Sequence, residues 1–458
     1  MGLLSQPFVV FWRARVRRHY NASRFERATE LAMQNVHHSS EAEFARDIVL
    51  RSLYNRGMWQ QVQDFASKFP SLNSQNYAEK ARIKLVAGQN YIDKQPTQFR
   101  SKIWNSKEIL SNWHQEENTL WLRHENGWTF WDMPDGFSLE ATSPSLLHLA
   151  LEVLLFPWNP EVKKWEVEPR LMGKNLALSY SGGVDSTAAA LLMPDDTILA
   201  YHRRSFDSML THDLATNVFN SWQTKRGREV LQIASNHERI RTYHDLQIGF
   251  STANAAAVHL ILLADYLDLK GIAFGTPIDN TWLKKGSKYR DFSGSQYLNY
   301  WASQFAKAGL EYLLPINHIS EAGALLVCSQ SDFANVVNSC LRGTGKKWCG
   351  KCWKCFHKNG PLGRKFDPTS KEITQFLNSK PLRTAQHALW ALQKQNLEDL
   401  APHLTPHIDG DLSWWEQAYP KGLEILKPYL RSHVKENTEK YLTWMEEPYP
   451  LEKVNLNV

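Results

Sequence analysis

Apolar residues at three- and four-residue spacing predict helices at both ends of the chain. Over residues 1–95 this spacing runs through SRFERATELAMQNV and SEAEFARDIVLRSLYNRG, and it places the apolar side chains on one face of each helix. The pattern returns over residues 365–458, where TAQHALWALQKQNLEDL is amphipathic and Pro and Trp residues interrupt the segments. We therefore expect helical regions before and after the central part of the chain.

The central part alternates short apolar runs with helical stretches. Strands are expected at residues 176–180, 197–202, 229–233 and 271–275. Helices are expected to begin between them, near Ser186, Asp207 and Ala253. This alternation predicts an α/β fold, a doubly wound parallel sheet with helices on both faces. Such sheets bind ligands beyond the carboxyl ends of their strands.

A hairpin and a helix precede this sheet. TLWLRHENGWTFWDM alternates apolar and polar residues around Asn126-Gly127, a two-residue hairpin turn, and Ser143-Pro144 begins an apolar helix. We divide the chain into a helical N-terminal region (1–115), a connecting region of hairpin plus helix (116–170), an α/β domain (171–362) and a helical C-terminal region (363–458).

The segment SGGVDST lies between the first expected strand and the helical run AAALLM. Two glycines remove side chains that would block a phosphate, and the amides at the start of the helix face an anion. The serines add hydroxyl donors, and the aspartate implies Mg²⁺ between its carboxylate and the phosphates. The predicted phosphate-binding residues are Ser181, Gly182, Gly183, Val184, Asp185, Ser186 and Thr187.

Other candidates follow later strands. Arg203 and Arg204 end the second strand, where they either contact a nucleotide or form a solvated pair. Gly275 and Thr276 end a later strand, and the glycine would let a nucleotide approach the backbone. Further polar positions either reach metal, substrate or phosphates or form charged loops: Asn254, Asp279, Asn280, Lys284, Lys285, Arg290 and Asp291.

Four of the five cysteines fall within sixteen residues, in the pattern C-x8-C-x2-C-x2-C. Four thiolates match a closed, tetrahedral structural Zn²⁺ site, with an iron–sulfur cluster as the alternative. The predicted ligands are Cys340, Cys349, Cys352 and Cys355, and Cys328 is expected to be a buried thiol. Basic residues nearby would offset the thiolate charge: Arg342, Lys346, Lys347, Lys351 and Lys354.

The SGGVDS loop resembles that of the PP-loop (N-type) ATP pyrophosphatases. The resemblance implies a fold of the adenine nucleotide alpha hydrolase-like (HUP) type. It also implies cleavage of ATP to AMP and pyrophosphate, with ATP and Mg²⁺ bound at the loop. On this basis we assign catalytic roles to Asp185, Ser186 and Asp279, and nucleotide contacts to the loop, Arg203, Gly275 and Thr276.

The loop and the cysteine spacing together resemble the 7-cyano-7-deazaguanine synthase (QueC) family, over residues 174–360. The SC…WCxxCxKC ending is also similar to MurL-type epimerases of a peptidoglycan precursor. Both families adenylate a carboxylate, which implies an AMP-forming enzyme for amide- or nitrile-type ligation, or an epimerase. The chain departs from the PP-loop pattern at Glu321, where a lysine is expected.

The net charge of the chain limits the classes of partner that we expect. The net charge of +6 permits an anionic substrate but is too weak to indicate tRNA or other nucleic acid. No apolar run reaches the roughly 18 residues of a membrane helix, so we expect a cytoplasmic protein. The expected partners are ATP and a carboxylate-bearing substrate, with a protein or peptide acceptor as one form of it. A tRNA-modifying enzyme and a non-catalytic nucleotide-binding scaffold remain as alternatives.

Overall fold

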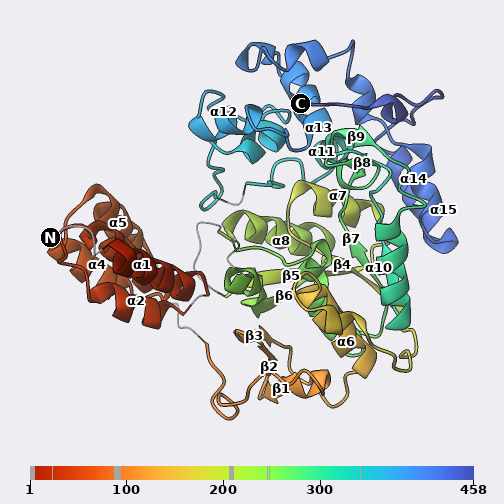
Figure 1. The fold of residues 1–458 in the computed structure, drawn as a ribbon. Coiled ribbons are helices and arrows are strands. Elements are labelled where there is room, and N and C mark those ends of the chain that lie inside the picture. The colour runs from red at the N-terminus through yellow and green to blue at the C-terminus, as the bar shows by residue number, and fades with distance from the viewer. Residues whose placement is uncertain are drawn as a thin grey trace.

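An eight-stranded sheet forms the centre of the molecule, and helical regions precede and follow it (Figure 1). The computed structural model describes residues 6–22, 24–86, 94–205, 211–244, 246, 248–340 and 342–458. The strands of this sheet are β1 (Trp113–Glu116), β2 (Thr119–His124), β3 (Gly127–Asp132), β4 (Asn175–Ser179), β5 (Ile198–Arg204), β6 (Val230–Ser235), β7 (Leu269–Phe274) and β10 (Glu311–Leu313). A separate pair consists of β8 (Leu283–Lys284) and β9 (Lys288–Tyr289).

Five strands run parallel, in the order β6-β5-β4-β7-β10. The four expected strands appear as β4, β5, β6 and β7, with bounds within two residues of those expected. The short β10 was not expected, because three residues carry no readable alternation. The chain order reverses between β4 and β7, since β4 continues to β5 on one side and β7 to β10 on the other. Ligands in open α/β sheets bind at such a reversal.

Helices follow the parallel strands. They are α7 (Val184–Leu192), α8 (Asp213–Arg226), the 3₁₀ turn η4 (Ala253–Ala257), α9 (Val258–Leu262), α10 (Gln296–Lys307) and α11 (Glu321–Ser329). The helix expected near Ser186 begins two residues earlier, at Val184. The expected start at Asp207 lies outside the described residues, and α8 begins at Asp213. The largely parallel sheet and its helices confirm a mixed α/β architecture.

The hairpin that precedes the parallel strands extends the same sheet. Its strands β1, β2 and β3 pair antiparallel, and β3 meets β6 at Trp131 and Ser235. The hairpin turn lies one residue before the expected Asn126-Gly127, because Gly127 already pairs with His124. A Cβ atom on Gly127 would lie 2.6 Å from the Tyr243 hydroxyl, so this glycine is needed for close packing. After the hairpin, α6 (Pro144–Leu155) packs against α9.

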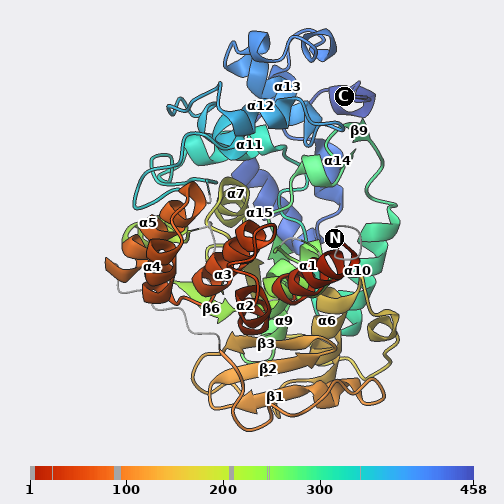
Figure 2. The ribbon, with the colours of Figure 1, turned by 60° about the vertical axis from the view of Figure 1, so that its left-hand side comes forward.

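The N-terminal helices form a bundle with its own apolar core (Figure 2). They are α1 (Gln6–Asn21), α2 (Phe25–Met33), α3 (Ala42–Asn55), α4 (Trp59–Lys68) and α5 (Leu72–Val86). One contact with the sheet region is a cation–π pair, in which the Arg239 guanidinium lies 5.1 Å from the Phe25 ring centroid. In the described part of the chain, no helix has the length and apolar character needed to cross a bilayer.

The C-terminal lobe, residues 363–458, covers the end of the sheet that carries α7 (Figure 1). Its helices are α12 (Lys371–Leu377), α13 (Ala385–Lys394), α14 (Pro420–Glu424) and α15 (Pro428–Glu439). Helix α15 packs on α7, and Asn437 donates a hydrogen bond to the Leu192 carbonyl at 3.3 Å. The Ser320 hydroxyl, at the start of α11, donates to the Trp415 carbonyl. The lobe therefore contacts the helices that border the Ser181–Ser186 loop.

Replacing Asn236 tests whether the hairpin belongs to the folding unit of the sheet. Asn236 Oδ1 accepts hydrogen bonds from the Thr129 hydroxyl at 2.7 Å and the Phe130 amide at 3.0 Å. Asn236→Ala should lower the free energy of unfolding by about 1–3 kcal/mol, because two donors lose their partner. The exposed Asn220→Ala is the control and should leave it unchanged. Equal unfolding curves for the two variants in urea would contradict the role given to Asn236.

Candidate functional site

A cavity of about 340 Å³ lies at the carboxyl ends of β4, β5 and β7. Residues from the segment between β4 and α7 form one wall, and residues after β7 form another. Among the predicted site residues, those that line the cavity are Ser181, Gly183, Asp185, Ser186, Arg204, Gly275, Thr276 and Cys340. The cavity is therefore located where the order of the parallel strands reverses, and the two predicted segments meet there.

Hydrogen bonds within the loop fix its shape. Ser186 Oγ lies 2.9 Å from Ser181 Oγ and accepts from the Ser181 amide at 3.2 Å. The Val184 amide, predicted to face a phosphate, instead donates to Ser339 Oγ at 3.1 Å. The Thr187 hydroxyl points to the core, where it contacts the Tyr180 hydroxyl at 2.9 Å. The structure thus gives Val184 and Thr187 internal partners and leaves both outside the cavity lining.

Two of the glycines allow protein backbone, rather than a ligand, to approach closely. Gly182 has a φ of +71°, and a Cβ atom there would lie 3.0 Å from Ala215 on α8. Gly182 therefore packs against α8, behind the loop. A Cβ atom on Gly275 would lie 2.9 Å from the Ser186 Cα. The close approach predicted at Gly275 is therefore made by the backbone of α7, although Gly275 also borders the cavity.

On β5 the cavity is lined by Arg204 and not by the predicted Arg203, which is exposed. Arg204 Nε lies 2.8 Å from the buried carboxylate of Glu238, which also lies 3.0 Å from His202 Nε2. Burial lowers the pKa of His202 well below its ordinary value, so its imidazole is neutral and Nε2–H donates to Glu238. Glu238 thereby holds Arg204 at the cavity wall.

A buried lysine connects the loop to α11. Lys358 Nζ lies 2.7 Å from Asp185 Oδ1 and 2.8 Å from Glu321 Oε2, and its side chain is 5 % exposed. Lys358 comes from the π-helical turn η6 (Cys355–Asn359), where the Gly360 amide donates to the Cys355 carbonyl. Flanked by two carboxylates, the ammonium has its pKa raised above the ordinary value. A protein cation thus pairs with the carboxylate for which the sequence indicated Mg²⁺.

Asp279 is completely buried beneath this group and lies outside the cavity lining. Its Oδ2 accepts from the Glu321 amide at 2.8 Å, at the first residue of α11, and its Oδ1 has no partner among the described residues. Burial raises the pKa of Asp279 well above its ordinary value of 3.8, and the charge of Glu321 raises it further. The predicted catalytic Asp279 therefore acts here as a cap and support of α11.

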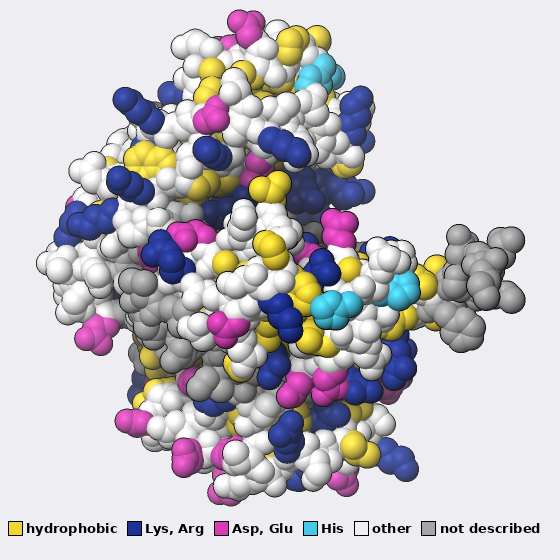
Figure 3. All heavy atoms as spheres, turned by 90° about the vertical axis from the view of Figure 1, so that its left-hand side faces the viewer, with side chains coloured by type: hydrophobic (Ala, Val, Ile, Leu, Met, Phe, Trp, Pro, Cys, Tyr) yellow, Lys and Arg dark blue, Asp and Glu magenta, His cyan; other side chains and the backbone are white. Residues whose placement is uncertain are grey.

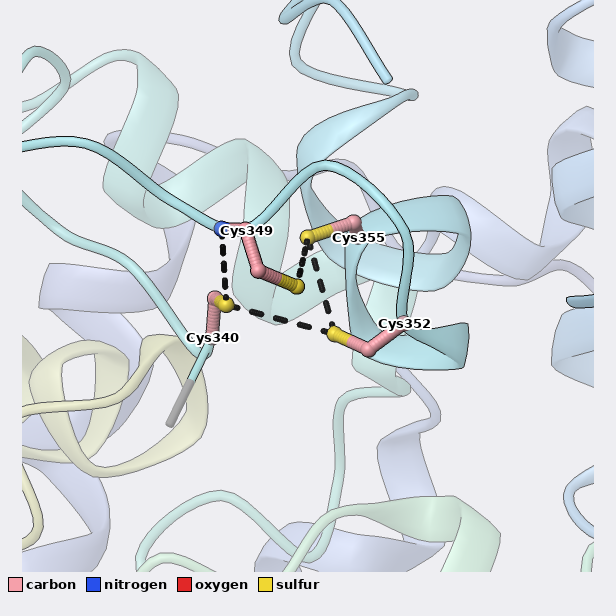
Figure 4. Close-up of side chains that lie close together, drawn as sticks. All are labelled: Cys340, Cys349, Cys352 and Cys355. Carbon is pink, nitrogen blue, oxygen red and sulfur yellow. Dashed lines mark hydrogen bonds between the residues drawn. The ribbon is translucent and has the colours of Figure 1, made fainter. Parts of the chain in front are cut away.

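The four cysteines converge (Figure 4). The Sγ–Sγ distances are 3.6 Å for Cys352–Cys355, 3.9 Å for Cys340–Cys352 and 3.8 Å for Cys349–Cys355. Four sulfurs bound tetrahedrally to one Zn²⁺ at about 2.3 Å lie roughly 3.8 Å apart. Amides also donate to the sulfurs, from Cys349 N to Cys340 and from Asn359 Nδ2 to Cys355. The cluster therefore fits a tetrahedral metal ion, as the spacing predicted.

The cysteine segment also forms part of the cavity. Ser339, Cys340 and Lys354 line it, although sequence reasoning had assigned Lys354 to the metal centre. Lys354 and Lys358 were both missed as site residues, but their spacing of four in CWKCFHK was a readable signal that both face one side of a helical turn. In the space-filling view, Lys and Arg side chains gather in a recess between the uppermost part and the middle of the molecule (Figure 3).

A second group, Glu321, His357 and His387, is close enough to hold a metal ion. Both nitrogens of the buried His357 lack partners among the described residues. His387, however, uses both of its nitrogens, since Nε2 contacts the His357 carbonyl at 3.1 Å and Nδ1 faces the Trp415 indole N–H at 3.4 Å. Glu321 already pairs with Lys358. We therefore interpret this group as buried side chains that pack beside Lys358. Burial lowers the pKa of both imidazoles, so they are neutral.

Metal analysis of purified protein tests the cysteine cluster. We expect one zinc per chain by mass spectrometry, because the four sulfurs already have tetrahedral spacing. Cys352→Ser should remove most of the metal and lower the melting temperature, whereas Cys328→Ala, outside the cluster, should retain the metal. Iron with visible absorption in the wild type would instead indicate an iron–sulfur cluster.

The pH dependence of stability tests the state of Asp279. Because its pKa is higher in the folded chain than the unfolded value of 3.8, the folded state keeps a proton that the unfolded state loses. The free energy of unfolding then falls as pH rises above about 4, by up to about 1.4 kcal/mol per pH unit for one proton. Asp279→Asn should reduce this slope and stabilise the protein at pH 7, and the exposed Asp196→Asn should not. Equal slopes in all three proteins would contradict a protonated Asp279.

Comparison with known proteins gives one match. Residues 300–449, about a third of the chain, match the model of a family of unknown function, DUF6395. The matched segment contains Glu321, the cysteine cluster and Lys358, but it excludes the Ser181–Ser186 loop and β4 to β7. No curated protein and no solved structure shows significant similarity to the chain.

Proposed function

We propose that the protein is a PP-loop ATP pyrophosphatase that adenylates a substrate carboxylate and releases pyrophosphate. The observation that carries the proposal is one cavity whose lining combines residues of the Ser181–Ser186 segment, at the start of α7, with Lys354 and Arg204. Serine hydroxyls, backbone amides at a helix start and two cations are the groups that hold polyphosphate. The position at the reversal of strand order supports a nucleotide-binding, doubly wound fold.

In the proposed reaction a carboxylate oxygen attacks the α-phosphorus of ATP. A new P–O bond forms, the bond to the β-phosphate oxygen breaks, and that oxygen leaves with its electron pair as pyrophosphate. The chain supplies positioning and charge through Lys354 and Arg204, which both line the cavity. Fixed positive charge near phosphates stabilises the developing charge of the leaving group.

Asp185 is the candidate Mg²⁺ ligand, because it is the acidic residue among the described residues that line the cavity. Its side chain is 30 % exposed, and one of its oxygens is bound to Lys358. Mg²⁺ would neutralise phosphate charge when bound with ATP. Lys358 keeps the carboxylate oriented in its absence. The closed Cys₄ metal centre holds the segment that carries both lysines, which is a structural role.

A carboxylate acceptor is favoured over sulfur insertion into tRNA. A sulfur relay needs a reactive thiol outside the metal site, and Cys328 is the one cysteine outside the cluster. Cys328 is fully buried, donates to the Val184 carbonyl at 3.4 Å, and has its pKa raised by burial. A thiol of this kind is inert. Ligation to an amide or nitrile and epimerisation of a peptidoglycan precursor both begin with the proposed adenylation.

The nucleotide product tests the proposal. With α-³²P-labelled ATP, Mg²⁺ and a pooled extract of small metabolites, the wild type should form AMP and pyrophosphate in an extract-dependent manner. Lys354→Ala should lower kcat/KM by about 10²-fold, the usual effect of losing one group that stabilises transition-state charge. Lys351→Ala, an exposed lysine of the same segment, is the matched control and should retain activity. ADP and phosphate as products would refute the proposal.

A further inference from the structure

A second cavity, of about 470 Å³, lies beside the first. The two cavities share a wall made by Asp185, Gly275 and Thr276, together with Ala253 and Phe274. The second cavity continues beneath the loop that joins β7 to β8 and reaches the start of α10. The shared wall means that a molecule in the second cavity lies directly against the phosphate loop.

Arg290 gives this cavity a positive charge with no acidic partner. Its Nε donates to the Thr281 carbonyl at 2.6 Å and its Nη2 donates to the Asn280 carbonyl at 3.1 Å. These backbone acceptors fix the guanidinium without neutralising it. Among the described residues no carboxylate forms a salt bridge with Arg290, and its Nη1 has no hydrogen-bond partner. An immobilised guanidinium with a free N–H is suited to a carboxylate ligand.

Asn254 provides an independent signal for a ligand. It is 1 % exposed and lines the same cavity, and its Nδ2, which lies near the Tyr297 hydroxyl, makes no hydrogen bond of normal geometry among the described residues. Its amide is oriented by Tyr312, whose hydroxyl donates to Asn254 Oδ1 at 3.1 Å. A buried amide donor without an acceptor costs free energy, and an oxygen atom of a ligand would remove this cost.

The remaining lining sets the shape of the ligand. Phe274, Phe292 and Leu314 contribute apolar surface, and all three side chains are almost completely buried. The exposed Tyr297 lies at the cavity as well. Aromatic and aliphatic walls favour a ligand with a flat or apolar body. The volume suits a small molecule and not a folded protein surface.

We propose that this second cavity binds a small carboxylic acid with an apolar or aromatic body, held by Arg290 and Asn254. The acid is the substrate whose carboxylate is adenylated, and this role rests on the proposed function. Binding of the acid does not rest on it, because Arg290 and Asn254 lie outside the lining of the ATP cavity. The shared wall at Asp185 then places the acid next to the site of ATP.

Ligand-observed NMR tests the binding directly, with 3-phenylpropionate as the probe and 3-phenylpropanamide as the neutral control. The wild type should bind the acid and not the amide. Arg290→Gln should weaken binding of the acid by at least about tenfold, the effect of losing a charged hydrogen bond. The exposed Arg383→Gln is the matched control and should bind as the wild type does. Equal binding of acid and amide, or no binding of either, would overturn the proposal.

Two further measurements distinguish a loss of acid binding from misfolding and from a loss of the ATP reaction. Asn254→Ala leaves Arg290 in place and should also weaken binding of the acid, with a melting temperature close to that of the wild type. A fluorescent ATP analogue should bind Arg290→Gln as well as it binds the wild type, whereas Lys354→Ala should bind it more weakly. Loss of nucleotide binding in Arg290→Gln would overturn a separate acid site. Acid binding without formation of AMP would refute the proposed function while leaving the acid site intact.

Discussion

The ion pairs of Lys358 are the interaction on which the site depends. An ammonium group that is 5 % exposed lies between the carboxylates of Asp185 and Glu321, and it ties the Ser181–Ser186 loop to the first turn of α11. Replacing a buried ion pair by apolar side chains is often neutral for stability, but removing one partner typically costs about 3–5 kcal/mol. Lys358 is therefore better explained by the orientation of Asp185 than by stability.

This arrangement makes the cysteine cluster and the Ser181–Ser186 loop parts of one unit. Cys355 and Lys358 lie on the same turn, η6, so four sulfurs held by one ion would also fix the position of the ammonium. Ser339, next to the first cysteine, accepts the Val184 amide at the start of α7. The C-terminal lobe packs on α7 and contacts α11 through Ser320. Regions that follow the sheet in the sequence thus complete the cavity.

The two cavities share one wall, but their linings suit different ligands. The first combines the glycine loop with Lys354 and Arg204, groups that suit phosphates. The second combines the fixed guanidinium of Arg290 and the buried amide of Asn254 with apolar walls, and these groups suit an organic acid. Asp185 belongs to both linings. The proposed adenylation needs its two substrates in contact, and the shared wall meets this requirement.

The sequence by itself determined what depends on local pattern. Apolar runs located β4 to β7, the glycine pair located the loop, and the cysteine spacing located a cluster that could hold a metal ion, because strands, tight turns and chelating segments involve neighbours in the chain. Only the tertiary structure decided which side chains face the cavity. It placed Arg204 there and Arg203 outside, buried Asp279 beneath α11, and brought Lys358 to Asp185 from 173 residues away. Such choices depend on strand register and on packing between distant segments, which one-dimensional patterns do not encode.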